Sequence, residues 1–397
     1  MLTLDKIYHA AFVLREIIRP TDIIEAPGIS EKGKIFLKTE NLQITGSFKV
    51  RGSYYKISRL SDEEKAKGVI ACSAGNHAQG VALAATKSNI PSLICLPDGA
   101  PISKVEATKA YGAKVKLVPG VYDDAYKEAL RLKEEHGYAF IHPFDDEDVI
   151  AGQGTIGLEL LEQLPEVDAV VIPIGGGGLA SGVAYALKAL KPEIKVYGVQ
   201  ASGAACMLKS FHNKKIECLD CVNTIADGIA VKEPGKLTYE LCGKYLDDIV
   251  SVTDEEISTA ILKLIESRKL ITEGAGAASV AAVMFDKLPI EGKNVVCILS
   301  GGNIDVTILS RVIKRGLLKT GRTHSLIIEL TDKPGQLKAV STIIADLGAN
   351  VTSVRHDKVG EHLDINGCYL KIGMETRDFA HIEQIENALR KNGYNLI

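Results

Sequence analysis

The stretch AVVIPIGGGGLASGVAYALKAL, residues 169–190, carries the pattern that decides the fold of this protein. Its first six residues are apolar without alternation, four successive glycines come next, and the remaining residues have the spacing of a helix. A strand that is apolar on both faces is typical of a parallel sheet covered by helices on both sides. The stretch therefore predicts a buried strand, a tight glycine loop and a helix, in that order.

Three further stretches repeat this order of short apolar strand, polar turn and helix. They are VIACSAGNHAQGVALAATKS from residue 69, PSLICLPDGAPISKVEATKAYG from residue 91 and NVVCILSGGNIDVTILSRVI from residue 294. Alternating strands and helices of this kind predict an α/β architecture with buried parallel sheets between about residues 34 and 310. In such sheets ligands bind at the carboxyl ends of the strands, which is where the polar loops fall.

The pattern changes at KRGLLKTGRT, residues 314–323, which is cationic and rich in turn residues. We interpret it as a linker between a first domain, 1–313, and a second, 324–397. The first domain is expected to contain a smaller lobe at roughly residues 40–140. In the second domain the expected order of elements is β-α-β-β-α-β, which is the ferredoxin-like arrangement.

Composition limits the classes of function. The chain has 397 residues, of which 46% are hydrophobic and 24% charged, as expected for a folded globular protein. Its net charge of −3 provides no basic surface for nucleic acid. Charged residues interrupt residues 1–20, which predicts an amphipathic helix instead of a signal peptide, and Pro173 with the glycines divides the longest uncharged run. We therefore predict a cytoplasmic protein without nucleic-acid or membrane partners.

The eight cysteines are expected to be reduced, since no secretory signal is present. Cys218 and Cys221 have the spacing of a metal-binding or redox pair. No second pair of cysteines and no paired histidines follow them, so we predict no metal site.

The glycine loop is the first candidate binding site. Its residues place backbone N–H groups beside a helix N-terminus, where they can approach a phosphate closely; they are Gly175, Gly176, Gly177, Gly178 and Leu179. The lysine and hydroxyl residue of a Walker loop are missing. A plain strand-to-helix turn is the alternative, but such a turn rarely needs four successive glycines.

Two further loops are polar at the end of a predicted strand. SAGNHAQG, which starts at Ser73, presents Ser73, Asn76 and His77 beside exposed backbone donors, a plausible seat for a carboxylate. SGGN, Ser300–Asn303, is similar. Helix capping is the alternative interpretation of both loops.

Lys49 lies in GSFKVRG, residues 46–52, among glycines and serine. A surface charge is the ordinary interpretation of such a lysine. However, a phosphate-binding loop without a Walker lysine suggests a phosphorylated cofactor, and pyridoxal phosphate requires an enzyme lysine for covalent attachment. Lys49 is the candidate for that amine.

Five motifs in this order resemble those of threonine dehydratases (threonine ammonia-lyases), pyridoxal-phosphate enzymes of the tryptophan-synthase-β-like fold group. They are ENLQITGSFKVRG, SAGNHAQGVA, PIGGGGL, TIADGIAV and CILSGGN. The C-terminal region, with ELTDKPGQL at residues 329–337, resembles an ACT regulatory domain. The resemblance implies a two-lobed catalytic domain with parallel or mixed sheets, followed by a ferredoxin-like ACT domain.

The resemblance also implies roles for individual residues. Lys49 would hold pyridoxal 5'-phosphate as a Schiff base, with Phe48 beside the ring. Asn76 would bind the ring hydroxyl, Gly228 would line the ring edge and Ser300 would face the ring nitrogen. The Gly175–Leu179 loop would hold the phosphate. The substrate carboxylate would be held by the loop of Ser73, Ala74, Gly75, Asn76 and His77.

The activity implied is conversion of L-threonine, and also of L-serine, to a 2-oxo acid and ammonia, with freed Lys49 as general base. A neutral Ser300 at the ring nitrogen would favour elimination over transamination. L-serine dehydratase and serine racemase of the same fold are alternatives, as is a non-catalytic amino-acid sensor. The racemases carry an acidic metal ligand just after the strand that reads VYGVQ here, where this chain has Gln200 and then ASGA, residues 201–204.

The ACT-like domain is expected to bind an amino-acid effector, with isoleucine or valine as the hypothesis because the product feeds isoleucine biosynthesis. Candidate contacts are Asp332–Leu337 and Leu347–Val351. The resemblance further implies a homodimer or homotetramer.

Overall fold

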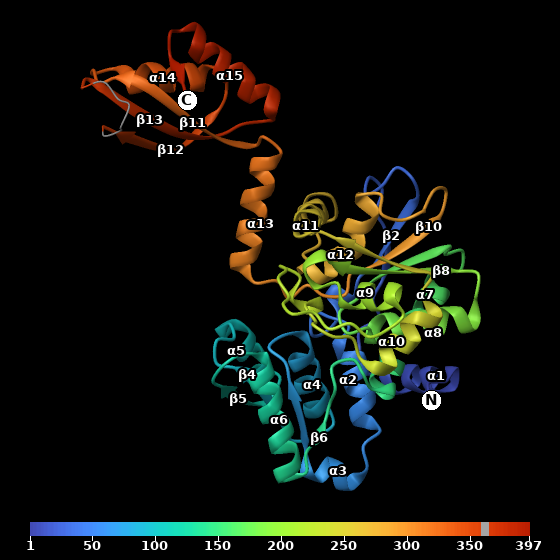
Figure 1. The fold of residues 1–397 in the computed structure, drawn as a ribbon. Coiled ribbons are helices and arrows are strands. Elements are labelled where there is room, and N and C mark those ends of the chain that lie inside the picture. Colours follow the sequence, from blue (N-terminus) through green and yellow to red (C-terminus); the bar gives the residue numbers. More distant parts are fainter. Residues whose placement is uncertain (359–364) are drawn as a thin grey trace. The chain divides into compact units, whose positions relative to one another are not determined.

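A computed structural model describes residues 1–358 and 365–397 of the chain. These form two compact units, 1–305 and 306–397 (Figure 1). The second unit begins with helix α13, Val306–Lys319, so residues 314–319 of the predicted linker are helical. The predicted α/β class with parallel and mixed sheets and a C-terminal ferredoxin-like domain is confirmed.

The first unit contains a six-stranded sheet that includes the glycine-loop strand. All neighbouring strands are parallel except for the antiparallel pair β1–β2. In spatial order the strands are β1 (Ile23–Glu25), β2 (Lys34–Lys38), β10 (Asn294–Ile298), β7 (Ala169–Pro173), β8 (Lys195–Ala201) and β9 (Asp248–Val252).

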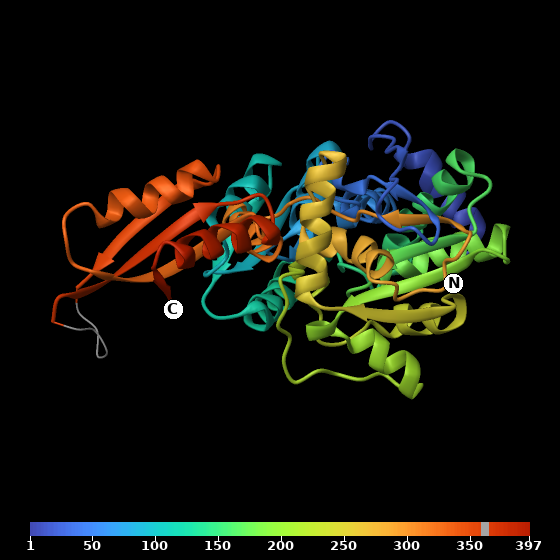
Figure 2. The same cartoon turned by 90° about the horizontal axis from the view of Figure 1, so that it is seen from above.

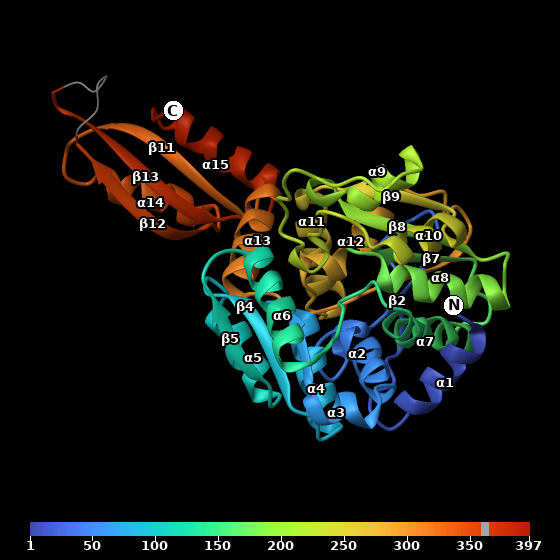
Figure 3. The ribbon, with the colours of Figure 1, turned by 60° about the horizontal axis from the view of Figure 1, so that its bottom comes forward.

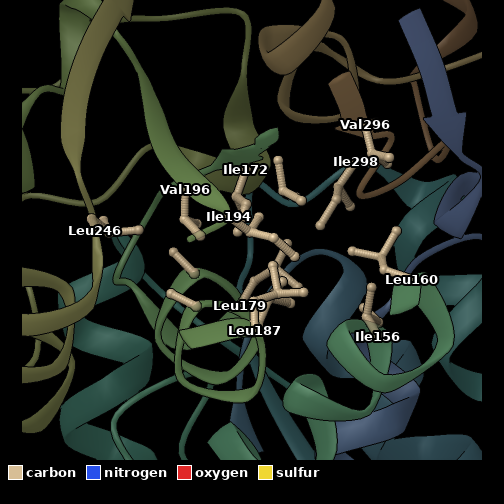
Figure 4. Packing of buried hydrophobic residues seen from close by; sticks show 14 of the residues in the cluster. Ile156, Leu160, Ile172, Leu179, Leu187, Ile194, Val196, Leu246, Val296 and Ile298 are labelled. Carbon is tan, nitrogen blue, oxygen red and sulfur yellow. The ribbon is translucent and has the colours of Figure 1, made fainter. Parts of the chain in front are cut away.

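Helices cover both faces of this sheet, as its continuous apolar strands require. Helices α7 (Glu147–Gln163), α8 (Gly178–Leu190) and α10 (Lys236–Tyr245) lie on the face to which Val296 and Ile298 point. Figure 4 shows the aliphatic side chains of α7 and α8 packed against those of the strands. Burying such side chains stabilises the fold by about 25 cal/mol per Å² of apolar surface.

The opposite face carries helix α12 (Gly274–Met284), with α11 (Asp254–Arg268) packed against it. The Cys297 thiol lies against the carbonyl of Ser279 in α12, so Cys297 points away from the α8 face. Successive side chains of β10 therefore point alternately to the two helical layers.

A smaller parallel sheet lies within the same unit (Figure 3). Buried side chains on alternate strand positions meet α4 and α5 on one face and α6 on the other. Its strands, in spatial order, are β5 (Lys114–Val118), β4 (Ser92–Pro97), β3 (Val69–Cys72) and β6 (Ala139–Phe140), and its helices are α4 (Asn76–Lys87), α5 (Ile102–Ala110) and α6 (Tyr122–His136).

The remaining segments of the first unit are short. Its other helices are α1 (Leu4–Leu14), α2 (Lys49–Ser58), α3 (Asp62–Lys67), α9 (Cys206–Asn213) and the 3-10 turns η1 (Glu40–Leu42), η2 (Ser202–Ala204) and η3 (Asp227–Ile229). Among the residues that the structure describes, no helix has both the length and the apolar character needed to cross a membrane.

In the second unit, helices α14 and α15 cover one face of an antiparallel sheet, and both helices run along its strands (Figures 1 and 2). The strands pair in the order β12-β13-β11-β14. The elements are β11 (Thr323–Thr331), α14 (Gln336–Asp346), β12 (Asn350–Asp357), β13 (Gly367–Glu375), α15 (Phe379–Lys391) and β14 (Asn395–Leu396).

A buried ionic network fixes helix α2, whose first residue is Lys49. The Arg51 guanidinium donates to both carboxylate oxygens of Glu40, at 2.8 and 2.7 Å, and also to Glu159 on α7. Lys38 on β2 donates to the same Glu159 at 2.6 Å. Arg51, Glu40 and Lys38 are fully buried. Arg51 therefore ties α2 to α7, and through Glu159 to the sheet, so it positions Lys49 instead of facing solvent.

We predict that Glu40→Ala lowers the stability of the protein strongly, because it leaves the buried Arg51 cation half unpaired, at a cost of roughly 3–5 kcal/mol. The midpoint of guanidinium unfolding measures the loss. The control is Glu63→Ala, which removes the exposed pair with Lys67 and should hardly move the midpoint. Equal shifts for the two variants would contradict the assignment of this network.

Candidate functional site

Lys49 begins α2, and its amine is held inside the first unit. The Lys49 Nζ donates to the carbonyl of Pro143 at 2.9 Å and lies 5.3 Å from the centre of the Phe48 ring. Burial lowers the pKa of Lys49 to about 8, and the negative charge of Glu273 opposes that shift. The amine can therefore exchange protons near neutral pH, which an ordinary surface lysine cannot do.

The glycine loop presents a row of unpaired backbone donors at the start of α8. Within the described chain, the N–H groups of residues 175–179 meet no hydrogen-bond acceptor, although residues 176–179 are buried. Gly177 has a φ of +100°, and a side chain on Gly176 would overlap the Phe144 ring. Packing and backbone conformation thus require glycine, and the donors face a position suited to an anion.

The loop of residues 73–77 has the same character at the start of α4. The N–H groups of Ala74, Asn76 and His77 find no acceptor in the described part of the chain, while Gly75 N–H donates to Ser73 Oγ at 3.1 Å. The His77 imidazole points elsewhere: its Nε2 lies 2.8 Å from the Ile141 carbonyl, and burial lowers its pKa to about 3. His77 therefore offers the loop its backbone N–H and not a charged ring.

Asn76 belongs to a polar cluster that joins three loops. Its Nδ2 donates to Glu273 Oε1 at 2.6 Å, and its Oδ1 accepts from Asn303 Nδ2 at 2.7 Å. Glu273 is only 4% exposed, and burial, followed by the charge of Asp227, raises its pKa to about 7. A buried carboxyl thus orients the amide of the predicted cofactor residue.

Ser300 is buried at the end of β10, next to this cluster. Its carbonyl accepts from the Phe48 N–H at 3.2 Å, and Gly302 N–H donates to the Gly46 carbonyl at 2.8 Å. The 300–303 loop is therefore attached directly to the segment that carries Lys49.

Gly228, in η3, lies between the glycine loop and Glu273. A Cβ on Gly228 would lie 3.0 Å from Glu273 Oε1, and a Cβ on Gly175 would lie 3.5 Å from the Gly228 carbonyl. The chain thus brings together the segments around Lys49, Asn76, Gly175, Gly228 and Ser300.

Gln200 and Asp227 have structural partners instead. Gln200 is buried, with its amide donating to the Ile174 carbonyl at 3.2 Å and accepting from the Leu208 N–H at 2.7 Å. Asp227 pairs with Lys104 at 2.5 Å. Cys218 and Cys221 are free and exposed.

These residues fit pyridoxal phosphate. Unpaired N–H groups at residues 175–179 match a phosphate, and a lysine whose pKa is about 8 matches an amine that reacts with a carbonyl group. The second set of unpaired N–H groups, at residues 74–77, matches a substrate carboxylate.

Sequence reasoning missed Glu273. It stands in TEGAGA, residues 272–277, where a glutamate before an apolar helix reads as an ordinary helix start. Its contact with Asn76 spans 197 positions. No local pattern signals that pairing.

Family models match nearly the whole chain. A model described as pyridoxal-phosphate dependent enzyme matches residues 14–301, and an ACT domain model matches residues 324–393. An L-threonine ammonia-lyase of Thermotoga maritima is 48% identical over 398 aligned positions, covering 100% of this chain and 99% of that protein.

Solved structures agree with these matches. The processed form of threonine deaminase isoform 2 from Solanum lycopersicum has a TM-score of 0.74 at 38% identity, covering 79% of this chain and 89% of its own. Maize serine racemase has a TM-score of 0.74 at 36% identity, and the match covers 80% of this chain and 98% of the racemase chain. Together with the site geometry, these matches lead to one conclusion: the chain belongs to the family of pyridoxal-phosphate-dependent enzymes and carries a C-terminal ACT domain.

Proposed function

We propose that this protein is a threonine ammonia-lyase, which uses pyridoxal phosphate to convert L-threonine to 2-oxobutanoate and ammonia and also accepts L-serine. The observation that carries the proposal is the half-buried Lys49 amine, with a pKa of about 8, in a site whose two helix starts present unpaired N–H groups. The full-length similarity to an L-threonine ammonia-lyase supports the choice of substrate.

Each group of the chain has a part in this chemistry. Bound pyridoxal phosphate supplies an electron sink for the charge left when the substrate loses its α-proton. The N–H groups of Gly175–Leu179 hold the phosphate, and those of Ala74, Asn76 and His77 hold the substrate carboxylate. Lys49, once its amine is free, accepts the α-proton, for which a pKa near the working pH is favourable. Ser300, which is buried just after β10, would face the ring nitrogen as a neutral hydroxyl.

We predict that Lys49→Ala abolishes covalent cofactor attachment and lowers 2-oxobutanoate formation from L-threonine by at least about 10²-fold, the lower end of the usual contribution of a general base. The absorption spectrum before and after borohydride reduction reports attachment. Lys56→Ala, on the same helix and paired with Asp146, is the control and should retain both properties. Cofactor that stays covalently attached in Lys49→Ala would refute the assignment.

A second prediction concerns Glu273. Because its negative charge raises the pKa of Lys49 against the effect of burial, Glu273→Gln should lower that pKa while preserving an acceptor for Asn76. The neutral amine would then form at lower pH. The rate at which apoenzyme takes up pyridoxal phosphate, measured against pH, should show a midpoint below that of the wild type.

The exposed carboxylate of Glu31 provides the control, since Glu31→Gln should leave this midpoint in place. A midpoint that is unchanged or higher in Glu273→Gln would show that Glu273 does not act on Lys49.

Serine racemase is the second candidate, favoured by the similarity to the maize enzyme. The family resemblance disfavours it, because it places the acidic metal ligand of the racemases where this chain has the neutral, buried Gln200. Incubation with L-serine decides between the two: pyruvate supports the lyase, whereas D-serine as the main product supports the racemase.

We further infer that the second unit binds an amino-acid effector, with isoleucine or valine as the candidates. A pocket of about 430 Å³ lies where β11 turns into α14 and is lined by residues 330–337, His356, Cys368 and Leu370. The start of α14 provides the donors for a carboxylate. Assembly into a homodimer or homotetramer through the ACT domains belongs to this proposal.

The pocket predicts how a substitution changes regulation. Gly335 has a φ of +95° at the start of α14, so Gly335→Ala strains the pocket wall and should weaken the effect of L-isoleucine or L-valine on the rate. Gly393→Ala provides a control, because Gly393 has a similar φ of +83° and open space around it. If none of the branched-chain amino acids alters the kinetics of the wild-type enzyme, the effector proposal is contradicted.

A cytoplasmic location is also part of the proposal. All eight cysteines are free, as is usual in a reducing compartment.

A further inference from the structure

Three metal-binding side chains meet at the wall of the pocket in the second unit. They are Asp332, just after β11, His356 on β12 and Cys368 on β13, and their ligand atoms all lie within 4.8 Å of one another. The His356 Nε2 and the Cys368 Sγ are 2.8 Å apart. We propose that Asp332, His356 and Cys368 bind one divalent transition-metal ion of the zinc class.

The pairing of the strands brings these residues together. Cys368 on β13 is opposite Leu330 on β11, and His356 on β12 is opposite Leu370 on β13, so all three strands contribute neighbouring positions. The Asp332 N–H donates to the Asn366 carbonyl at 2.7 Å, which continues the ladder past the end of β11. In the described part of the chain, hydrogen bonds between backbone groups of β11, β12 and β13 thus hold the three donor residues in place.

The chemistry of the donors selects the metal. A thiolate, an imidazole and a carboxylate are the ligands that Zn²⁺ prefers, whereas Ca²⁺ and Mg²⁺ prefer oxygen alone. From Zn–N and Zn–S bonds of about 2.0–2.3 Å, ligand atoms in a tetrahedral site lie roughly 3.5 Å apart. The distances between the three donors, 2.8 Å for His356 and Cys368 and at most 4.8 Å within the whole set, bracket that separation.

The surroundings suit an open site with three protein ligands. The Lys358 Nζ lies 2.5 Å from one Asp332 oxygen, Oδ2, which leaves Oδ1 for the metal and lets Lys358 orient the carboxylate. Cys368 is 1% exposed, so its sulfur is shielded from oxidants by the core of the unit. The remaining coordination position faces the pocket, where water or a bound amino acid would complete it.

The chain contains a competing thiol site, which provides a matched control. Cys218 and Cys221 are exposed and have the spacing of a zinc pair, but among the described residues they form no close group with a third donor. The two sites lie in different units and can be distinguished by substitution.

The test uses full-length holoenzyme, freed of metal with a chelator and then titrated with Co²⁺ or Zn²⁺. We expect one metal per chain by elemental analysis, visible d–d absorption typical of tetrahedral Co²⁺, and a sulfur-to-metal band in the difference spectrum. Cys368→Ser should remove that band, and His356→Gln should weaken Zn²⁺ binding at least tenfold in competition with a coloured chelator. The double variant Cys218→Ser/Cys221→Ser should leave both the sulfur-to-metal band and the affinity for Zn²⁺ unchanged.

Because Cys368 is buried, His356→Gln, which alters an exposed residue, keeps the test valid if Cys368→Ser does not fold. Absence of stoichiometric metal in the wild type would overturn the proposal. Binding lost only in the Cys218/Cys221 variant would also overturn it. The readouts are metal content and spectra and not turnover, so the result is independent of the proposed lyase activity.

Discussion

Backbone N–H groups without a partner at the starts of α4 and α8 are the constraint on which the site depends. A buried donor that has no acceptor destabilises a fold by roughly 1–3 kcal/mol. Such donors belong to the buried residues 176–179 at the start of α8 and to the buried His77 at the start of α4. Their presence makes sense if ligands supply the acceptors. Strands β3 and β7, which belong to the two sheets of the first unit, end at these two turns, so the sheet topology determines where the unpaired donors lie.

Electrostatics then tune the amine placed beside these donors. The ionic network around Arg51 fixes α2, and α2 carries Lys49 into surroundings that disfavour its charged form. Glu273, itself buried, partly restores that charge and at the same time orients Asn76. Burial and one carboxylate thus act in opposite directions on the pKa of Lys49, which lies at about 8, so that a fraction of the amine is neutral at physiological pH.

The second unit depends on a different constraint. Its antiparallel sheet brings one end each of β11, β12 and β13 beside the start of α14, so the pocket and the proposed metal ligands share one wall. The short cysteine and histidine spacings of the chain predict no metal site, because such spacings detect only ligands that are close in sequence. Asp332, His356 and Cys368 are 24 and 12 positions apart, and antiparallel pairing alone makes them neighbours.

The sequence by itself determined the alternation of apolar strands and helices, the glycine loop, the candidate lysine and the order of elements in the ACT domain. These features are local, because hydrophobic period and turn chemistry act over a few residues. Only the tertiary structure decided that Glu273 meets Asn76, that the His77 ring turns to Ile141, and that Arg51 is buried in an ionic network. Such pairings depend on desolvation and on contacts between distant segments, which no local pattern encodes.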